Sequence, residues 1–157
     1  MTNNTKVNAA ILIIGNEILS GRTQDTNTTT LAKWLNSIGV VVNEVRVIQD
    51  VEKIIVDTLN VLRKTNNYVF TTGGIGPTHD DITAQSVAKA FGKKYEIHKE
   101  AFKILNAYYK PGEFNEGRQK MVKMPENAKL ILNPTSGAPG FNVENVFCLP
   151  GVPSILK

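Results

Sequence analysis

Apolar residues in the first half of the chain alternate between unbroken runs and helical spacing. The segment VNAAILIIG, residues 7–15, is apolar without alternation, which is typical of a strand covered on both faces of a sheet. A set of apolar residues then recurs at i, i+3, i+4 and i+7: Leu31, Trp34, Leu35 and Ile38. This spacing predicts a helix with one apolar face, closed by Gly39 as a left-handed cap.

The same alternation repeats twice more. VVVNEVRVI, residues 40–48, predicts a second strand, and Asp50 then opens a helix. The apolar face of that helix is Val51, Ile54, Ile55, Thr58, Leu59 and Leu62. NYVFTT, residues 67–72, predicts a third strand, followed by a helix at 83–91 that ends at Gly92. Strand–helix pairs at this spacing predict parallel strands and right-handed crossovers in a three-layer α/β/α sandwich.

The pattern changes beyond Lys94. Shorter elements are expected there: a strand at 95–98, a helix containing Phe102, Leu105 and Tyr109, a break at 110–112, a short basic helix from about Asn115, and a strand at 128–132. GFNVENVFCLP predicts a hairpin turning at Glu144 and Asn145, which adds an antiparallel element to the mostly parallel sheet. We expect a single domain over residues 1–157. The final VPSILK looks like the first turn of a helix, so we expect this domain to be cut from a longer protein.

Composition and charge narrow the functional classes. With 41% apolar residues and no window near the length of a membrane span, the chain has the composition of a globular domain. Its start lacks the pattern of a secretory signal, so the expected location is the cytoplasm, without membrane association. A net charge of +4 suits an anionic small molecule, and it does not favour nucleic acid as a partner. The single cysteine, Cys148, is expected to be a small buried hydrophobe, and it excludes an internal disulfide.

The stretch FTTGGIGPTHDDIT, residues 70–83, ends the third predicted strand in a glycine-rich loop. Gly73, Gly74 and Gly76 can take positive φ and have no Cβ, so backbone N–H groups can converge on an anion. A helix that begins directly afterwards reinforces such a site. At the carboxyl end of a parallel strand, this loop predicts a phosphate or pyrophosphate site. An ordinary Gly-Gly turn is the alternative. The stretch GGIGPT lacks the third glycine of a dinucleotide fingerprint, and no Walker-type motif exists in the chain.

Two adjacent carboxylates, Asp80 and Asp81, lie between the glycines and the next helix. They would repel a phosphate unless a cation lay between them, so they predict Mg²⁺ or a similar hard divalent ion. The alternative is that they only cap the helix. Thr83 can provide that cap by itself, which leaves Asp81 for chemistry. His79 is expected to be exposed rather than catalytic.

Four blocks of sequence, in this order, resemble a known family. They are ILIIGNEILSGRTQDTN, VIQDVEKI, TTGGIGPTHDDIT, and NPTSGAPGF followed by LPGVPS. Together they resemble the molybdopterin-binding domain of molybdenum cofactor biosynthesis proteins. The glycine-proline-acid block and the TSGAPGF block favour one branch of that family, the N-terminal domain of competence/damage-inducible CinA proteins.

The resemblance implies roles for particular residues. Asp81 looks like the essential acid after the glycine loop, and Asp50 like the acid that follows the second strand. Both would be catalytic and, with Asp80, would bind the metal. Glu17 occupies the family's acidic position after the first strand, although capping of the next segment is an equal alternative. The positions that match ligand- or phosphate-binding loops are Thr72, Gly73, Gly74, Gly76, Ser136, Gly137 and Gly151.

For CinA-type domains the resemblance implies a pyrophosphatase that acts on ADP-ribose or a related dinucleotide with Mg²⁺, Mn²⁺ or Co²⁺. Two alternatives are molybdopterin binding or adenylyl transfer with a pterin ligand, and a non-catalytic nucleotide-binding module. Arg118, Lys120 and Lys123 either offset phosphate charge or form a solvated helix face. The resemblance also implies a homo-oligomer, a dimer or a trimer.

Overall fold

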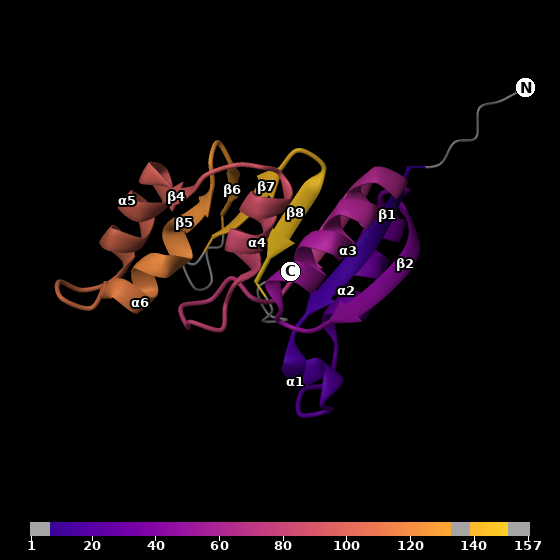
Figure 1. Cartoon of the computed structure of the whole chain (residues 1–157), viewed down its shortest axis with the longest axis horizontal. Coiled ribbons are helices and arrows are strands. Elements are labelled where there is room, and N and C mark those ends of the chain that lie inside the picture. The colour runs from indigo at the N-terminus through magenta and orange to yellow at the C-terminus, as the bar shows by residue number, and fades with distance from the viewer. Residues whose placement is uncertain (1–6, 133–138, 151–157) are drawn as a thin grey trace, which may run out of the picture.

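The centre of the molecule is a six-stranded sheet. The computed structural model describes residues 7–132 and 139–150, and the strand order is β2-β1-β3-β8-β7-β6 (Figure 1). The parallel strands are β2 (Val41–Ile48), β1 (Asn8–Ile14), β3 (Tyr68–Thr72) and β8 (Val146–Leu149). The antiparallel strands are β7 (Gly140–Val143) and β6 (Lys129–Ile131). The hairpin between β7 and β8 turns at Glu144 and Asn145, with Glu144 at φ 50. The mostly parallel sheet with a hairpin near the C-terminus confirms the predicted class.

Helices pack on both faces of the sheet because β1 is apolar on both sides. On one face, Leu12 of β1 packs with residues of α3 (Glu52–Thr65) and α4 (Thr83–Ala90). On the other face, Ile11 packs with residues of α2 (Asn27–Ser37). The three layers are therefore as predicted, and the unbroken apolar run at the start of the chain is explained by burial on both faces.

A smaller lobe lies beside the antiparallel end of the sheet, away from β2 (Figure 1). Its elements are β4 (Tyr95–Ile97), α5 (Lys99–Tyr108), α6 (Glu116–Gln119), the 3-10 helix η1 (Lys120–Val122) and β5 (Lys123–Pro125). The strands β4 and β5 pair with each other, antiparallel, in a separate two-stranded sheet. The lobe shares the core of the large sheet, since Leu105 of α5 and Met124 of β5 belong to the cluster that also contains Leu12.

Two local features go beyond the predicted pattern. The predicted apolar face of α2 is only half buried: Leu31 and Leu35 are buried, whereas Trp34 and Ile38 are 52% and 56% exposed. Periodicity shows which residues share a helix face, but not whether that face meets another layer along its whole width. Between β1 and α2 the chain also contains a short helix, α1 (Asn16–Leu19), at the end of the sheet.

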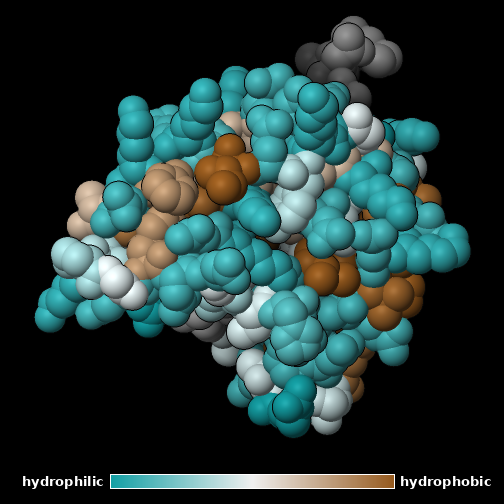
Figure 2. Space-filling model, turned by 60° about the vertical axis from the view of Figure 1, so that its left-hand side comes forward, coloured by the Kyte–Doolittle hydropathy of each residue, from teal (hydrophilic) through white to brown (hydrophobic). Residues whose placement is uncertain are grey.

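The surface in Figure 2 is mostly hydrophilic, and apolar side chains reach it in separate groups. Within the described ranges, no helix is long and apolar enough to cross a membrane.

Candidate functional site

Three neighbouring parallel strands, β2, β1 and β3, end at the same edge of the sheet, and their following loops enclose a polar cavity of about 410 Å³. Asn16, Glu17 and Arg22 come from the segment after β1, and Asp50 follows β2. Gly74, Asp80 and Asp81 come from the segment after β3. Segments far apart in the sequence therefore bring four carboxylates to one cavity.

The glycine loop is held tightly against its surroundings. Gly73 and Gly74 have φ of 93 and 75, and a Cβ on either would overlap the carbonyl oxygen of Ile14 or the hydroxyl of Thr83, respectively. The Thr83 hydroxyl donates to the carbonyl of Gly73 (2.9 Å), and the Thr83 N–H donates to the carbonyl of Gly74 (2.9 Å). The proposal that Thr83 caps α4 is thus wrong, because Ile82 precedes the helix and the Thr83 hydroxyl fixes the loop instead.

The amide groups of the loop differ in what they bind. The N–H of Gly73 donates to the carbonyl oxygen of Leu149 (3.2 Å), so it is not available to a ligand. Among the described residues, the N–H groups of Gly74 and Gly76 donate to no protein acceptor. These two amides are therefore available to a phosphate ligand, unlike that of Gly73.

Asp81 has a structural task beside any chemical one. Its Oδ2 accepts hydrogen bonds from the N–H (2.9 Å) and the hydroxyl (2.8 Å) of Thr78, and its own N–H donates to the Thr78 carbonyl (3.1 Å). Lys120 also donates its ammonium to that carbonyl, which ties the small lobe to the loop. Both side-chain bonds use Oδ2, so the other oxygen, Oδ1, is the one that can contact a ligand.

Asp50 is held by a reciprocal pair of hydrogen bonds. Its Oδ2 accepts from the N–H of Asn16 (3.1 Å), and its N–H donates to the side-chain oxygen of Asn16 (3.3 Å). Burial is the largest cause that raises the pKa of the Asp50 carboxyl above its ordinary value. The bond from Asn16 lowers this pKa, and the negative charges of three neighbouring carboxylates raise it: Glu17, Asp81 and Asp80. The raised pKa is thus partly a measure of how much negative charge the cavity concentrates.

The four carboxylates of the cavity offer oxygen ligands, which Mg²⁺ and Mn²⁺ prefer. In residues 7–132 and 139–150, no three His, Cys, Asp or Glu side chains converge closely enough to hold a metal ion by themselves. Mg²⁺ is commonly held by one or two carboxylates together with phosphate oxygens and water. The residues therefore fit a hard divalent ion that binds together with a phosphate ligand.

Not every predicted residue lies in the cavity. Thr72 is buried in β3, and Gly76 lines a small neighbouring pocket with Lys120 and Lys123. Asp80 lines the cavity, but its side chain is 81% exposed and pairs with His79 (3.3 Å). Ser136, Gly137 and Gly151 lie outside the described residues.

The basic residues of the small lobe also separate into two groups. Arg118 donates to the carbonyl of Glu113 (2.8 Å) and stacks over the ring of Tyr109 (4.6 Å), so it is used within the lobe. Lys120 and Lys123 line the small pocket beside the glycine loop.

Sequence reasoning missed Asn16, Arg22 and Thr78. For Thr78 a signal existed, because Thr-x-x-Asp is the spacing of a capping box, in which the acid reaches back to the first backbone N–H. For Asn16 and Arg22 no local signal existed, because their place in the cavity depends on which strand ends lie side by side.

Comparisons with known proteins agree with this architecture. A family model described as a probable molybdopterin binding domain matches residues 10–157. A crystal structure of the protein CinA, of unknown function, from Thermoplasma acidophilum is 34% identical with a TM-score of 0.89, over 96% of this chain and 92% of that one. A CinA-like protein from Syntrophotalea carbinolica is 35% identical over 153 residues, 94% of this chain and 37% of its own length.

More distant structures share the fold alone. The molybdopterin biosynthesis enzyme MoaB from Thermus thermophilus is 17% identical, with a TM-score of 0.64 over 96% of this chain and 84% of that one. The chain spans 63% and 58% of the length of two archaeal relatives that it matches.

Proposed function

Since the chain belongs to the molybdopterin-binding domain family, and is of the CinA type within it, we propose that it binds a nucleotide containing a pyrophosphate. We further propose that it hydrolyses the pyrophosphate bond of ADP-ribose, or of a related dinucleotide, with Mg²⁺, Mn²⁺ or Co²⁺.

The observation that carries this proposal is that one cavity contains both carboxylates and a backbone amide donor. Four carboxylates, Glu17, Asp50, Asp80 and Asp81, line the cavity together with Gly74, whose amide N–H donates to no acceptor among the described residues. Amide donors suit phosphate oxygens, whereas the carboxylates repel them. A divalent ion between the carboxylates and the phosphates reconciles the two. The cavity volume of about 410 Å³ is within the range of small-molecule sites.

Each residue has a defined part in the proposed site. Asp81, through Oδ1, and Asp50 would hold the metal, which when bound neutralises phosphate charge and lowers the pKa of a coordinated water. The amide of Gly74 would donate to a phosphate oxygen, and the Arg22 guanidinium at the cavity wall would offset further charge. In hydrolysis the water oxygen bonds to one phosphorus and the bridging oxygen leaves with the other. One proton of the water is released to solvent.

The test is product analysis by anion-exchange chromatography with ADP-ribose, in each metal and in excess chelator. We expect AMP and ribose 5-phosphate to appear only with metal, and to be lost in Asp81→Asn. The matched control is Asp57→Asn, which removes an exposed carboxylate of α3 paired with Lys53, outside the cavity. Turnover that survives Asp81→Asn, or that needs no metal, contradicts the proposal. Binding of ADP-ribose in calorimetry without turnover in any metal favours a non-catalytic module instead.

A second candidate is molybdopterin binding or adenylyl transfer. The description of the matched family model favours it, as does the shared fold with MoaB. A pterin chromophore that copurifies with the chain, or transfer of AMP from ATP to molybdopterin, would support this candidate. Competition between ADP-ribose and the pterin for binding would place both ligands in the same cavity.

A further inference from the structure

The small pocket beside the glycine loop adjoins the polar cavity, because Gly74 and Asp81 line both. Gly76 belongs to the wall that the loop provides. The small lobe provides another wall, through Tyr95 of β4, Lys120 of η1 and Lys123 of β5. The volume of the small pocket is about 10 Å³, which holds one water-sized group, such as an oxygen atom of a phosphate.

The small pocket and the polar cavity differ in the sign of their charge. The side chains that line the polar cavity include four carboxylates and one guanidinium, that of Arg22. Those that line the small pocket include two ammonium groups, of Lys120 and Lys123, and one carboxylate, that of Asp81. A cation is therefore attracted to the cavity and an anion to the small pocket. Because the two spaces meet at Asp81, a single ligand that carries both a metal ion and a further phosphate oxygen can occupy both.

Hydrogen-bond donors line the small pocket. Among the described residues, the N–H of Gly76 and the ammonium of Lys123 have no protein acceptor. The ammonium of Lys120 donates to the carbonyl of Thr78, which leaves further protons of that group for a ligand. Burial raises the pKa of the Tyr95 phenol, so this side chain also stays protonated. A negatively charged acceptor such as a phosphate oxygen suits these groups, whereas a metal ion does not.

We propose that the small pocket is a second phosphate subsite, in which the Gly76 N–H and the Lys123 ammonium bind an oxygen of the phosphate farther from the metal. This inference rests on the proposed function, since the first phosphate lies in the polar cavity at the Gly74 amide. Two residues of chain span at most about 7 Å, so the two amides are close enough to bind neighbouring phosphates of one pyrophosphate group. The subsite therefore selects organic diphosphates over monophosphates.

The test measures binding rather than turnover, by isothermal titration calorimetry with Mg²⁺. The probes are AMP and the α,β-methylene analogue of ADP, a diphosphate whose methylene bridge resists hydrolysis. We expect the wild type to bind the diphosphate about ten-fold more tightly than AMP, because hydrogen bonds to a charged group are gained. In Lys123→Met the affinity for the diphosphate is expected to fall by about ten-fold, with the affinity for AMP unchanged.

Two further variants show whether the charge at this position is responsible. Lys123→Arg keeps the charge and is expected to keep most of the preference for the diphosphate. The matched control is Lys103→Met, which removes an exposed lysine on α5 of the same lobe, outside both the small pocket and the polar cavity. This control is expected to leave both affinities unchanged. Circular dichroism checks that each variant is folded.

Several outcomes overturn the subsite. They are equal affinity of the wild type for the two probes, binding of neither probe, and a loss in Lys123→Met that is the same for both. A loss of similar size in Lys103→Met also overturns it, because the effect would then come from the net charge of the lobe. Failure of the proposed function is a different result, the absence of metal-dependent turnover, and it is compatible with an intact preference for the diphosphate.

Discussion

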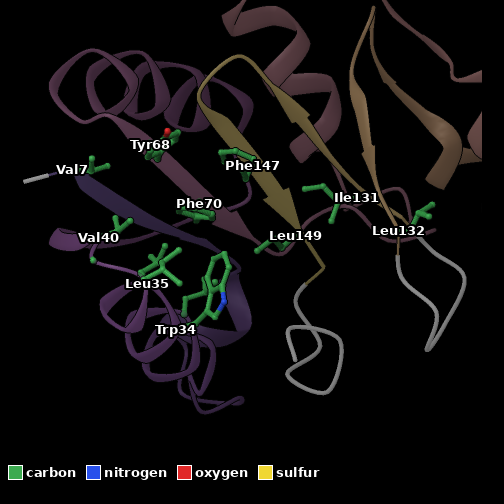
Figure 3. Close-up of a pocket in the computed structure, with 13 residues that line it drawn as sticks. Val7, Trp34, Leu35, Val40, Tyr68, Phe70, Ile131, Leu132, Phe147 and Leu149 are labelled. Atoms are coloured by element: carbon green, nitrogen blue, oxygen red, sulfur yellow. The ribbon is translucent and has the colours of Figure 1, made fainter.

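The polar cavity and the α2 groove, an apolar space of about 700 Å³ on the α2 face of the sheet, share strand β3 but are built by opposite means. Trp34 and Leu35 of α2 form one wall of this groove, and Phe70 of β3 and Phe147 of β8 stack in the other (Figure 3). In the cavity, short loops are fixed by hydrogen bonds and by glycine conformations, and charge is concentrated in a small volume. In the groove, side chains from α2, β3, β6 and β8 meet by packing, and none of the described residues that line it is charged. A substitution at the cavity is therefore expected to have its effect by removing one charge or one hydrogen-bonding atom. A substitution at the groove is expected to have its effect by changing the buried apolar area.

The sharpest contrast is expected at Asp81, where charge and loop structure can be separated. Asp81→Asn keeps a side-chain oxygen that accepts from Thr78 but removes the negative charge. We expect kcat on ADP-ribose to fall by about 10²- to 10³-fold, as when one electrostatic partner of a transition state is lost. Thr78→Ala removes one hydroxyl donor and keeps the charge, and is expected to retain most activity. Equal losses in the two variants would mean that Asp81 acts only by holding the loop.

Next in size is the effect of filling the glycine loop. In Gly74→Ala the new Cβ would meet the hydroxyl of Thr83, in addition to the strain of a positive φ. We expect the free energy of unfolding in urea to fall by about 3 kcal/mol. Gly39→Ala is the control, because Gly39 also has a positive φ (86) but open space around it. That variant is expected to lose only about 1 kcal/mol. If the two losses match, contact with Thr83 has no part in setting the loop.

A smaller effect is expected from pH at Asp50. Its pKa is raised in the folded chain above the ordinary 3.8, so the folded state holds the proton more tightly than the unfolded state. This contribution to stability is complete below pH 3.8 and is lost as pH rises through the folded pKa. In Asp50→Asn this decrease in stability with rising pH is expected to be absent, and urea titrations at several pH values can measure it.

Mg²⁺ with a bound nucleotide is expected to lower the Asp50 pKa in carbon-detected NMR titrations, and an unchanged pKa argues against metal contact.

The smallest effect is expected in the α2 groove. Trp34→Leu removes an edge-on contact with Phe70, but the indole is half exposed, so little burial is lost. We expect a loss of about 1 kcal/mol or less in the free energy of unfolding, and no change in kcat. Phe147→Leu, at the stacked pair deeper in the wall, is expected to cost more than Trp34→Leu. A change of kcat in Trp34→Leu would show that the two regions are not independent.

The contrast between the regions also explains what the sequence can and cannot predict. The glycine loop is contiguous, so its position at a strand end and its neighbouring acids are readable from residues 70–83. The meeting of Asp50 with Asn16 depends on two strands being neighbours, which a parallel α/β pattern only suggests. The role of Thr83 was misread because its hydroxyl bonds a residue ten positions away, outside the reach of capping rules.

The groove was harder to predict for a physical reason. Trp34 and Ile38 repeat with Leu31 and Leu35 at helical spacing, and this pattern is the same whether a helix face is covered fully or in part. How much of the α2 face is covered depends on how far the sheet extends beside it. The strands β6, β7 and β8, from the far end of the chain, contribute to that extent. Burial of Cys148 was correctly predicted because its neighbours in the strand are all apolar, and burial raises the pKa of its thiol to about 12.

The hydrogen bond from Gly73 to Leu149 has a practical consequence for anyone who handles the protein. It joins the glycine loop to the last residue of the last strand, one position before Pro150. Strain put on the end of β8, for example by a bulky fusion partner, would therefore act directly on the glycine loop. Affinity tags therefore belong at the N-terminus, on the polar residues before β1, at the opposite end of that strand from the cavity.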